Sequence, residues 1–170
     1  MRARRARAGD AAAIHQIVAH YAAQGMMLPR SEREIHEHVA RFLVLEDKGA
    51  IAGCVALEPY GTDLAEIRSL AVSPEILGRG LGARLLQAAL TEARRKKVAR
   101  VFAVTHAAEF FTKQGFATSS RHALPEKIER DCRTCSKART CRLIAVVFTA
   151  CPERVALPVL ETAVAPSPAV

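Results

Sequence analysis

The chain of 170 residues contains no tryptophan and only two tyrosines, although it carries a formal charge of +8. Proteins that bind single-stranded nucleic acid combine positive charge with aromatic side chains on which the bases stack. Such side chains are scarce here, and the basic residues are scattered along the chain. We therefore expect no nucleic-acid partner, and the positive charge points instead to a polyphosphate cofactor or an acidic small substrate.

Long apolar runs are also missing from the sequence. No run of about eighteen apolar residues occurs, so no membrane-spanning helix is predicted. The N-terminus has the arginines of a signal peptide but lacks its apolar segment. The five cysteines are an odd number and fit a reducing compartment better than a disulfide scaffold. Together these features predict a cytoplasmic protein without a membrane partner.

Hydrophobic periodicity predicts a chain of alternating strands and helices. Helical spacing occurs at 11–23, where Asp10 is the expected cap, at 31–40 behind a Ser31–Glu34 capping box, and in two later segments that begin near 81 and 106. Apolar or alternating runs predict the strands, which are 1–8, 41–47, 50–60, 64–72, 99–105 and 142–150. This order predicts one α/β (α+β) domain over residues 1–149, a mixed sheet with helices on both faces.

The C-terminal residues 150–170 differ in composition from the rest. The stretch "CPERVALPVLETAVAPSPAV" contains four prolines in twenty residues. Proline cannot donate a backbone hydrogen bond, and such tails seldom pack. We expect a disordered tail after the domain.

Three glycines alternate directly before the third predicted helix. The stretch Gly78-Arg79-Gly80-Leu81-Gly82-Ala83 follows a strand and opens a helix. Ala83 stands where a dinucleotide-binding fingerprint needs its third glycine, and the Gly-Lys-Ser/Thr of a P-loop is absent. Successive backbone amides and the helix dipole would instead face a pyrophosphate together. A glycine-rich turn without a ligand is the alternative.

The strand "EIRSLAVSP", the loop "GRGLGA" and the later "EFFTKQGF" resemble the Gcn5-related N-acetyltransferases, the GNAT superfamily. The resemblance implies a mostly antiparallel sheet, acetyl-CoA as cosubstrate, and a homodimer as an option, since dimers are common in the family. The family loop has the pattern Gln/Arg-x-x-Gly-x-Gly/Ala, and Leu77 departs from its first position. By the resemblance the cofactor contacts are Leu70, Ala71, Val72, Gly78, Arg79, Gly80, Leu81, Gly82 and Ala83.

Three further stretches resemble the N-acetylglutamate synthases, and the last of them resembles a segment of their short, single-domain bacterial form. These are "GMMLPRSEREIHEHVARFLVLEDKGAIAGCVALEPY" with its Leu-x-Arg-Ser signature, "LAEIRSLAV", and "LPEKIERDCRTC" followed by Cys141. The resemblance implies direct transfer of an acetyl group to the α-amino group of L-glutamate, the first step of arginine biosynthesis. The longer synthases add an amino-acid-kinase domain, which this sequence does not contain, so we expect no arginine feedback through such a domain.

The resemblance also assigns roles to individual residues. Glu66 would be the general base that deprotonates the amine, directly or through water. Arg30 would bind a substrate carboxylate, with Leu28 and Ser69 also lining the substrate site. An ordinary surface glutamate and a solvated arginine are the alternatives for Glu66 and Arg30. A second cation is needed for the other carboxylate, and three residues remain open for this role: Lys127, Arg139 and Arg142.

Thr105 is the expected proton donor to the departing thiolate. Many relatives use a tyrosine in the fourth helix, but Phe111 stands at that position. The synthases place a hydroxyl at the end of the fifth strand instead, and Thr105 matches it. His106 is an alternative proton carrier.

Cys132, Cys135 and Cys141 form the first half of a zinc knuckle without a regular second half. His122 or Cys151 could add a fourth ligand, but zinc is not favoured over free thiols or a redox pair, because three cysteines close no tetrahedral site. Two other functions stay open: a GNAT enzyme acting on another amine, such as a polyamine, a drug or a protein N-terminus, and a basic, zinc-binding module without catalysis.

Overall fold

A computed structural model describes residues 1–136 and 138–155 of the chain. Seven strands form one sheet in the order β1-β2-β3-β4-β5-β7-β6. All neighbouring strands are antiparallel except β4 and β5, which confirms the predicted mixed, mostly antiparallel sheet. The strands are β1 (Arg2–Arg5), β2 (Phe42–Asp47), β3 (Ala50–Tyr60), β4 (Leu64–Val72), β5 (Arg100–Thr105), β6 (Ala117–Ser119) and β7 (Ile144–Thr149).

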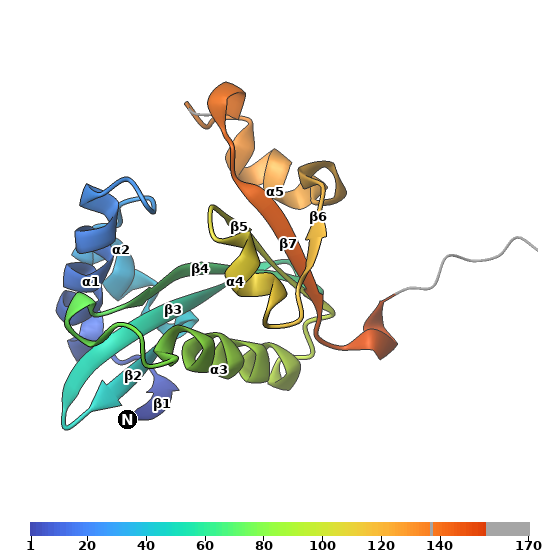
Figure 1. Cartoon of the computed structure of the whole chain (residues 1–170). Helices are drawn as coiled ribbons and strands as arrows, with labels where there is room; N and C mark the ends of the chain where they lie inside the picture. Colours follow the sequence, from blue (N-terminus) through green and yellow to red (C-terminus); the bar gives the residue numbers. More distant parts are fainter. Residues whose placement is uncertain (137, 156–170) are drawn as a thin grey trace, which may run out of the picture.

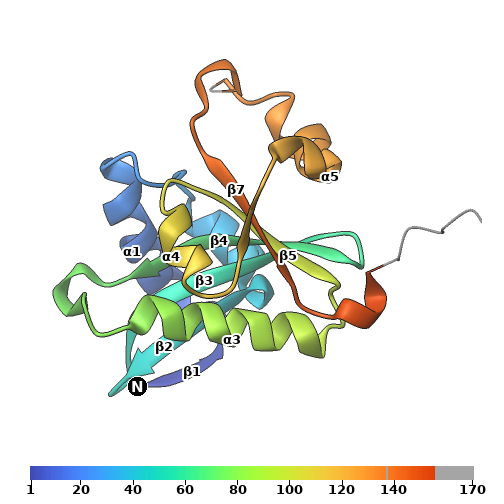
Figure 2. The ribbon, with the colours of Figure 1, turned by 45° about the vertical axis from the view of Figure 1, so that its right-hand side comes forward.

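Helices cover both faces of the sheet, as predicted (Figures 1 and 2). On one face lie α1 (Ala11–Ala23) and α2 (Glu32–Glu37), and on the other lie α3 (Leu81–Arg95) and α4 (Ala108–Thr112). A short helix α5 (Pro125–Lys127) continues into a π-helical turn over Ile128–Cys132. Each face of the sheet therefore has its own apolar core, one beneath α3 and one beneath α1.

Helix α3 forms because its apolar residues recur at helical spacing. A stripe of this kind buries one face of a helix and leaves the other to solvent. The residues buried on α3 are those that the spacing predicts: Leu81, Leu85, Leu86, Ala89, Leu90 and Ala93. Their burial beneath the sheet fixes the position of the N-terminus of α3, where the glycine loop ends.

The two predicted helix caps have different outcomes. Ser31 accepts a hydrogen bond from the Glu34 amide at 3.1 Å, which confirms it as the cap of α2. Asp10 is the N-cap residue of α1, as predicted, but its side chain makes no capping hydrogen bond to that helix. Its carboxylate accepts a hydrogen bond from the Arg7 amide at 2.7 Å and pairs with Arg4 at 2.7 Å, so it closes the turn before the helix.

Two elements of the fold were not expected from the sequence. The strand β6 has three residues, too few to show a period, and α5 is a single turn. At the C-terminal end, Ala150 and Cys151 are buried, and both amides donate to the Ala99 carbonyl oxygen. Most of the predicted disordered tail, residues 156–170, lies outside the described residues.

The sheet opens between β4 and β5. Their parallel pairing covers three residue pairs and ends where Glu66 faces Phe102. Beyond that pair β5 continues along β7, and Figure 1 shows β7 running obliquely to β3 and β4. The last part of β4, residues 67–72, therefore has an edge that β5 does not cover. No helix within residues 1–136 and 138–155 is long and apolar enough to cross a membrane.

Candidate active site

The glycine loop has the backbone conformation that favours glycine at two positions. Gly78 has φ +81° and Gly80 has φ +68°, both in the left-handed region that side chains with a Cβ rarely adopt. Gly80 is also the N-terminal cap residue of α3. The first amides of a helix have no partner within it, so this loop presents free donors at the positive end of the helix dipole.

The predicted cofactor contacts on β4 lie next to this loop. Ala71 and Val72 pair with Cys54 and Gly53 of β3, so they are fixed on one side while the opposite edge faces the opening toward β5. Tyr21 of α1 donates to the Val72 carbonyl oxygen at 2.7 Å and anchors the end of the strand. A strand edge that β5 does not cover, followed by a helix N-terminus, supplies amide donors in sequence, which fits the amide groups and pyrophosphate of acetyl-CoA.

Gly82, in the first turn of α3, lies next to helix α4. A Cβ built on Gly82 would lie 3.6 Å from the ring of Phe110 in α4, an ordinary contact, and its φ is not in the left-handed region. Phe110 therefore flanks the start of α3. Phe111, which replaces the family's tyrosine, is buried in the core beneath α3.

A bulge on β4 brings two of the predicted substrate residues together. Cys54 pairs with Ala71 and Ala56 pairs with Arg68, so two residues of β4 stand opposite one of β3. Ser69 lies in this bulge with φ +48°, an uncommon conformation for serine. Bulges of this kind redirect side chains and recur beside active sites.

Arg30 reaches Ser69 from the loop between α1 and α2. Its Nε donates to Ser69 Oγ at 3.2 Å, and an ion pair with Glu34 of α2 holds the guanidinium in place. The side chain of Arg30 is only 17% exposed. Leu28, by contrast, is 71% exposed and does not join this contact. The structure thus unites Arg30 and Ser69 and leaves Leu28 at the surface.

Glu66 lies at the inner end of the opening, where β4 and β5 stop pairing. The residue is 3% exposed, so it is not the surface glutamate of the alternative reading. Its Oε2 accepts hydrogen bonds from Tyr60 at 2.9 Å, from Arg68, and from Lys127 at 2.9 Å. The Lys127 ammonium is also 2.9 Å from Oε1. The carboxylate is therefore buried, paired and held in one orientation.

Asp131 completes this cluster from the π-helical turn. Its Oδ2 accepts hydrogen bonds from Tyr60, from Arg68 and from Lys127, the last at 2.7 Å. Burial acts to raise the pKa of Asp131, but the hydrogen bonds from Lys127 and Tyr60 outweigh it and hold the pKa well below its usual range. Asp131 is consequently a carboxylate at any physiological pH.

A second buried carboxylate lies opposite Glu66 on the neighbouring strand. Glu58 pairs across β3 and β4 with Glu66, and two like charges in this register repel. Burial acts to raise the pKa of Glu58, but hydrogen bonds from Arg41 at 2.7 Å and from Arg130 at 2.7 Å outweigh it and lower the pKa. Each carboxylate of the pair thus has its own two cations.

Tyr60 stands at the centre of the cluster. The Arg130 guanidinium lies 3.8 Å from its ring centroid, and the Phe102 ring packs edge-on at 5.3 Å. Burial first, and then hydrogen bonding to Asp131, raise the pKa of Tyr60 far above its usual value. The phenol stays protonated and can donate to either carboxylate.

Thr105 ends β5 on the other side of the opening. Its Oγ1 accepts a hydrogen bond from the Ala107 amide at 2.9 Å, which leaves the hydroxyl proton available for donation. Thr105 is three residues beyond Phe102, the partner of Glu66, or about 10 Å along the strand. His106 follows it and is exposed.

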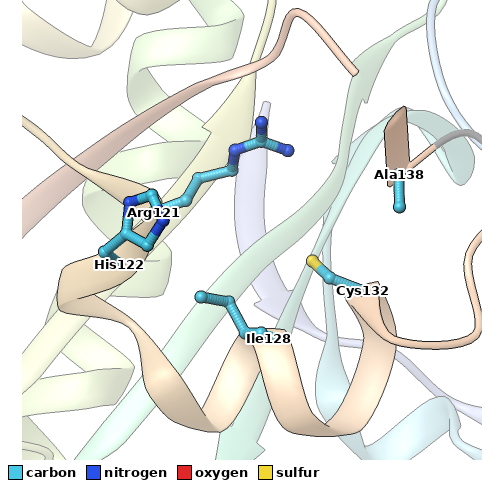
Figure 3. A pocket seen from close by; sticks show the side chains of 5 residues that line it. All are labelled: Arg121, His122, Ile128, Cys132 and Ala138. Carbon is cyan, nitrogen blue, oxygen red and sulfur yellow. The ribbon is translucent and has the colours of Figure 1, made fainter. Parts of the chain in front are cut away.

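The cysteine segment borders a cavity of about 170 Å³ beside the cluster (Figure 3). Cys132 points its sulfur toward this cavity, and His122 lines the same space. Cys151 lies at the opposite end of β7 from Cys141, so it cannot join the other cysteines. Within the ranges 1–136 and 138–155, no three histidine, cysteine or acidic side chains come together as a metal site.

Sequence reasoning missed four residues of this site: Tyr60, Arg68, Glu58 and Asp131. One signal was present. Polar side chains alternate in "ALEPY" and "AEIRSLAV", which are otherwise apolar strands, and period-two alternation places them on one face of the sheet. Of the three cations left open for a second carboxylate, Lys127 lies in the cluster, while Arg139 and Arg142 are exposed.

Comparison with known sequences places the chain among acetyltransferases. Residues 8–116 match the acetyltransferase (GNAT) family. The chain is 41% identical over 146 residues to an uncharacterized N-acetyltransferase of Chlorobaculum tepidum, a match that covers 86% of this chain and 94% of the relative. It is 37% identical over 133 residues to the amino-acid acetyltransferase of Neisseria meningitidis, where the match covers 77% of this chain but 30% of that longer protein.

Solved structures agree with this placement. The N-acetylglutamate synthase of Neisseria gonorrhoeae, complexed with coenzyme A and N-acetyl-glutamate, superposes with a TM-score of 0.80 at 32% identity, covering 88% of this chain and 35% of the synthase. A Mycobacterium tuberculosis protein complexed with coenzyme A superposes with a TM-score of 0.76 at 29% identity, covering 88% of this chain and 99% of that protein.

Proposed function

Because the chain belongs to the acetyltransferase (GNAT) family and uses acetyl-CoA, we propose that it acetylates the α-amino group of L-glutamate, as an N-acetylglutamate synthase. The buried Glu66 at the end of the β4–β5 opening carries this proposal, because the groups that bind it include two cations, Arg68 and Lys127. The relatives named amino-acid acetyltransferase support a free amino acid as the acceptor.

The charge balance of the site favours an acidic acceptor. Four carboxylates, those of Glu34, Glu58, Glu66 and Asp131, are paired with five cations of the same region. A polyamine would meet like charges from these cations, whereas a dicarboxylate would meet opposite ones. We assign one substrate carboxylate to Arg30, and the contact of its guanidinium with Ser69 at the bulge supports this assignment.

The chain's own groups then perform the transfer. Acetyl-CoA supplies the acetyl group as an activated thioester. Glu66 orients the α-amine and accepts its proton, directly or through water. Oε1 is the freer oxygen, because Lys127 lies 2.9 Å from both oxygens while Tyr60 and Arg68 donate to Oε2. A backbone amide near Leu70 stabilises the charge that develops on the acetyl oxygen. The Thr105 hydroxyl donates to the sulfur of the leaving thiolate.

This function corresponds to the first step of arginine biosynthesis, and we propose that the protein acts in the cytoplasm on free L-glutamate. Amino-acid acetyltransferases with this domain support the assignment. We further propose that residues 1–149 suffice for it.

Thiol release from acetyl-CoA tests the proposal, measured across free amino acids and simple amines. We expect turnover selective for L-glutamate. Glu66→Gln should lower kcat by a factor of about 10² or more, because a positioned general base contributes that much. Arg30→Gln should mainly raise the KM for L-glutamate.

Arg33→Gln is the matched control, since its guanidinium is 89% exposed and pairs with Glu37 on the surface of α2. Its kinetic constants should equal those of the wild type. Selective turnover of spermidine, or a Glu66→Gln variant with unchanged kcat, would contradict the proposal.

A further inference from the structure

Two cations and a phenol converge on one oxygen of the Asp131 carboxylate, which is only partly buried, and Arg130 pairs with its other oxygen at 3.5 Å. Asp131 Oδ2 accepts hydrogen bonds from Lys127 at 2.7 Å, from Arg68 and from Tyr60. The side chain of Asp131 is 28% exposed, whereas that of Glu66 is 5% exposed. The first carboxylate therefore lies on the solvent side of the cluster and the second on the inner side.

The Asp131 carboxylate lies at a distance from Glu66 that would suit the α-carboxylate of an amino-acid substrate. Lys127 Nζ is 2.9 Å from Glu66 and 2.7 Å from Asp131, so the two carboxylates lie within about 6 Å of each other. An α-amino acid carries its amine and its carboxylate on the same carbon. A substrate whose α-carboxylate replaced that of Asp131 would thus bring its amine within hydrogen-bonding reach of Glu66.

The donors at this position suit a carboxylate. An arginine and a lysine supply charge-assisted hydrogen bonds, and the protonated Tyr60 adds a neutral donor. Asp131 itself lies in a π-helical turn over Ile128–Cys132, a rare conformation that often occurs at functional sites. Its partial exposure leaves it a path toward solvent.

We propose that Arg68, Lys127 and Tyr60 form the binding position for the α-carboxylate of the substrate, and that Asp131 occupies this position until the substrate displaces it. The inference rests on the proposed function. It completes the recognition of a dicarboxylic amino acid, with Arg30 taking the side-chain carboxylate and the Arg68 position taking the α-carboxylate. Asp131 is then an internal competitor that excludes amines without an α-carboxylate.

Paired substrates test the proposal directly. L-glutamate is compared with its α-amide, L-isoglutamine, which keeps the side-chain carboxylate, and the readout is the ratio of the two kcat/KM values. We expect the wild type to prefer L-glutamate by about tenfold or more, the value of a hydrogen bond between charged groups. Arg68→Gln should bring this ratio close to one, while Arg33→Gln should keep it.

A purely structural role of Arg68 would lower the kcat/KM of both substrates equally, and an unchanged ratio would overturn the proposal. Should Arg68→Gln fail to fold, as judged by circular dichroism, Asp131→Asn gives an independent test. Removing the competing charge should lower the KM for L-glutamate several-fold with little change in kcat. A KM that rises or stays constant would overturn the proposal.

The two hypotheses fail differently. If the wild type acetylates no amino acid at all, the proposed function falls, and this inference falls with it. If the wild type acetylates L-glutamate but the preference over L-isoglutamine does not depend on Arg68, only this inference is wrong.

Discussion

Replacing Gly80 and Gly82 separately with alanine should change the stability of the fold in opposite directions. Gly80 has φ +68° and caps α3, whereas Gly82 lies inside the helix with an ordinary backbone conformation. An L-residue in the left-handed region costs about 1–2 kcal/mol. The reduced entropy of the unfolded chain recovers about 0.4–1 kcal/mol of that cost. Gly80→Ala should therefore lower the free energy of unfolding by about 1 kcal/mol.

Gly82→Ala has the opposite sign. Alanine is favoured over glycine within a helix by about 0.8–1 kcal/mol, and the new Cβ would meet the Phe110 ring at 3.6 Å, an ordinary contact. The two variants should thus differ by about 2 kcal/mol. In a domain of this size that difference corresponds to a Tm gap of about 4–8 °C.

Urea denaturation and calorimetric titration with coenzyme A would measure both consequences. Gly80→Ala should also bind coenzyme A more weakly, because relief of the strained φ rotates the amides at the start of α3. The family pattern accepts alanine at the position of Gly82, so Gly82→Ala should retain its affinity. Equal stabilities and equal affinities in the two variants would refute the role given to the left-handed turn.

Three further predictions follow from individual residues. Hydrogen bonds outweigh burial and hold the pKa of Asp131 below its usual value. The carboxylate therefore stabilises the fold above its unfolded pKa of about 3.9, and this contribution is lost as the pH falls from that value through the lower pKa of the folded state. Asp131→Asn should flatten the acid side of a Tm–pH profile, and an unchanged slope would contradict this. Burial raises the pKa of the Cys54 thiol to about 12, whereas Cys135 is exposed. Iodoacetamide at neutral pH should therefore alkylate Cys135 in the folded protein and Cys54 only after unfolding, as measured by mass spectrometry. Labelling of Cys54 in the folded protein would contradict this. Gly53→Ala should lower the free energy of unfolding by about 1–3 kcal/mol in urea denaturation, because the new Cβ would lie 2.8 Å from the Ala71 carbonyl oxygen. A variant as stable as the wild type would contradict this and would mean that β4 shifts to make room.

The parts of the fold that the sequence predicted are those with local periodicity. The buried stripe of α3 and the apolar runs of β3 and β4 repeat often enough for the pattern to identify them. The strand β6 has three residues and forms because β7 provides a partner, an interaction between distant segments. The side chain of Asp10 does not cap α1, because Arg4 and the Arg7 amide bind its carboxylate instead.

The candidate site divides in the same way. Glu66, Arg30 and the glycine loop were identified by motif, because each lies in a short stretch that resembles a known family. Arg68 and Asp131 were not, since they are 63 residues apart and meet only when the π-helical turn packs beside β4. No spacing within the sequence predicts a contact between segments so far apart in the chain.

Competition between acceptors would show whether L-glutamate is the substrate of acetyl transfer. The full chain is incubated with acetyl-CoA and an equimolar mixture of L-glutamate, L-glutamine, L-aspartate, L-lysine and spermidine, and the products are identified by mass spectrometry. We expect N-acetyl-L-glutamate as the main product. Acetylated spermidine or lysine as the main product, with L-glutamate unmodified, would contradict it.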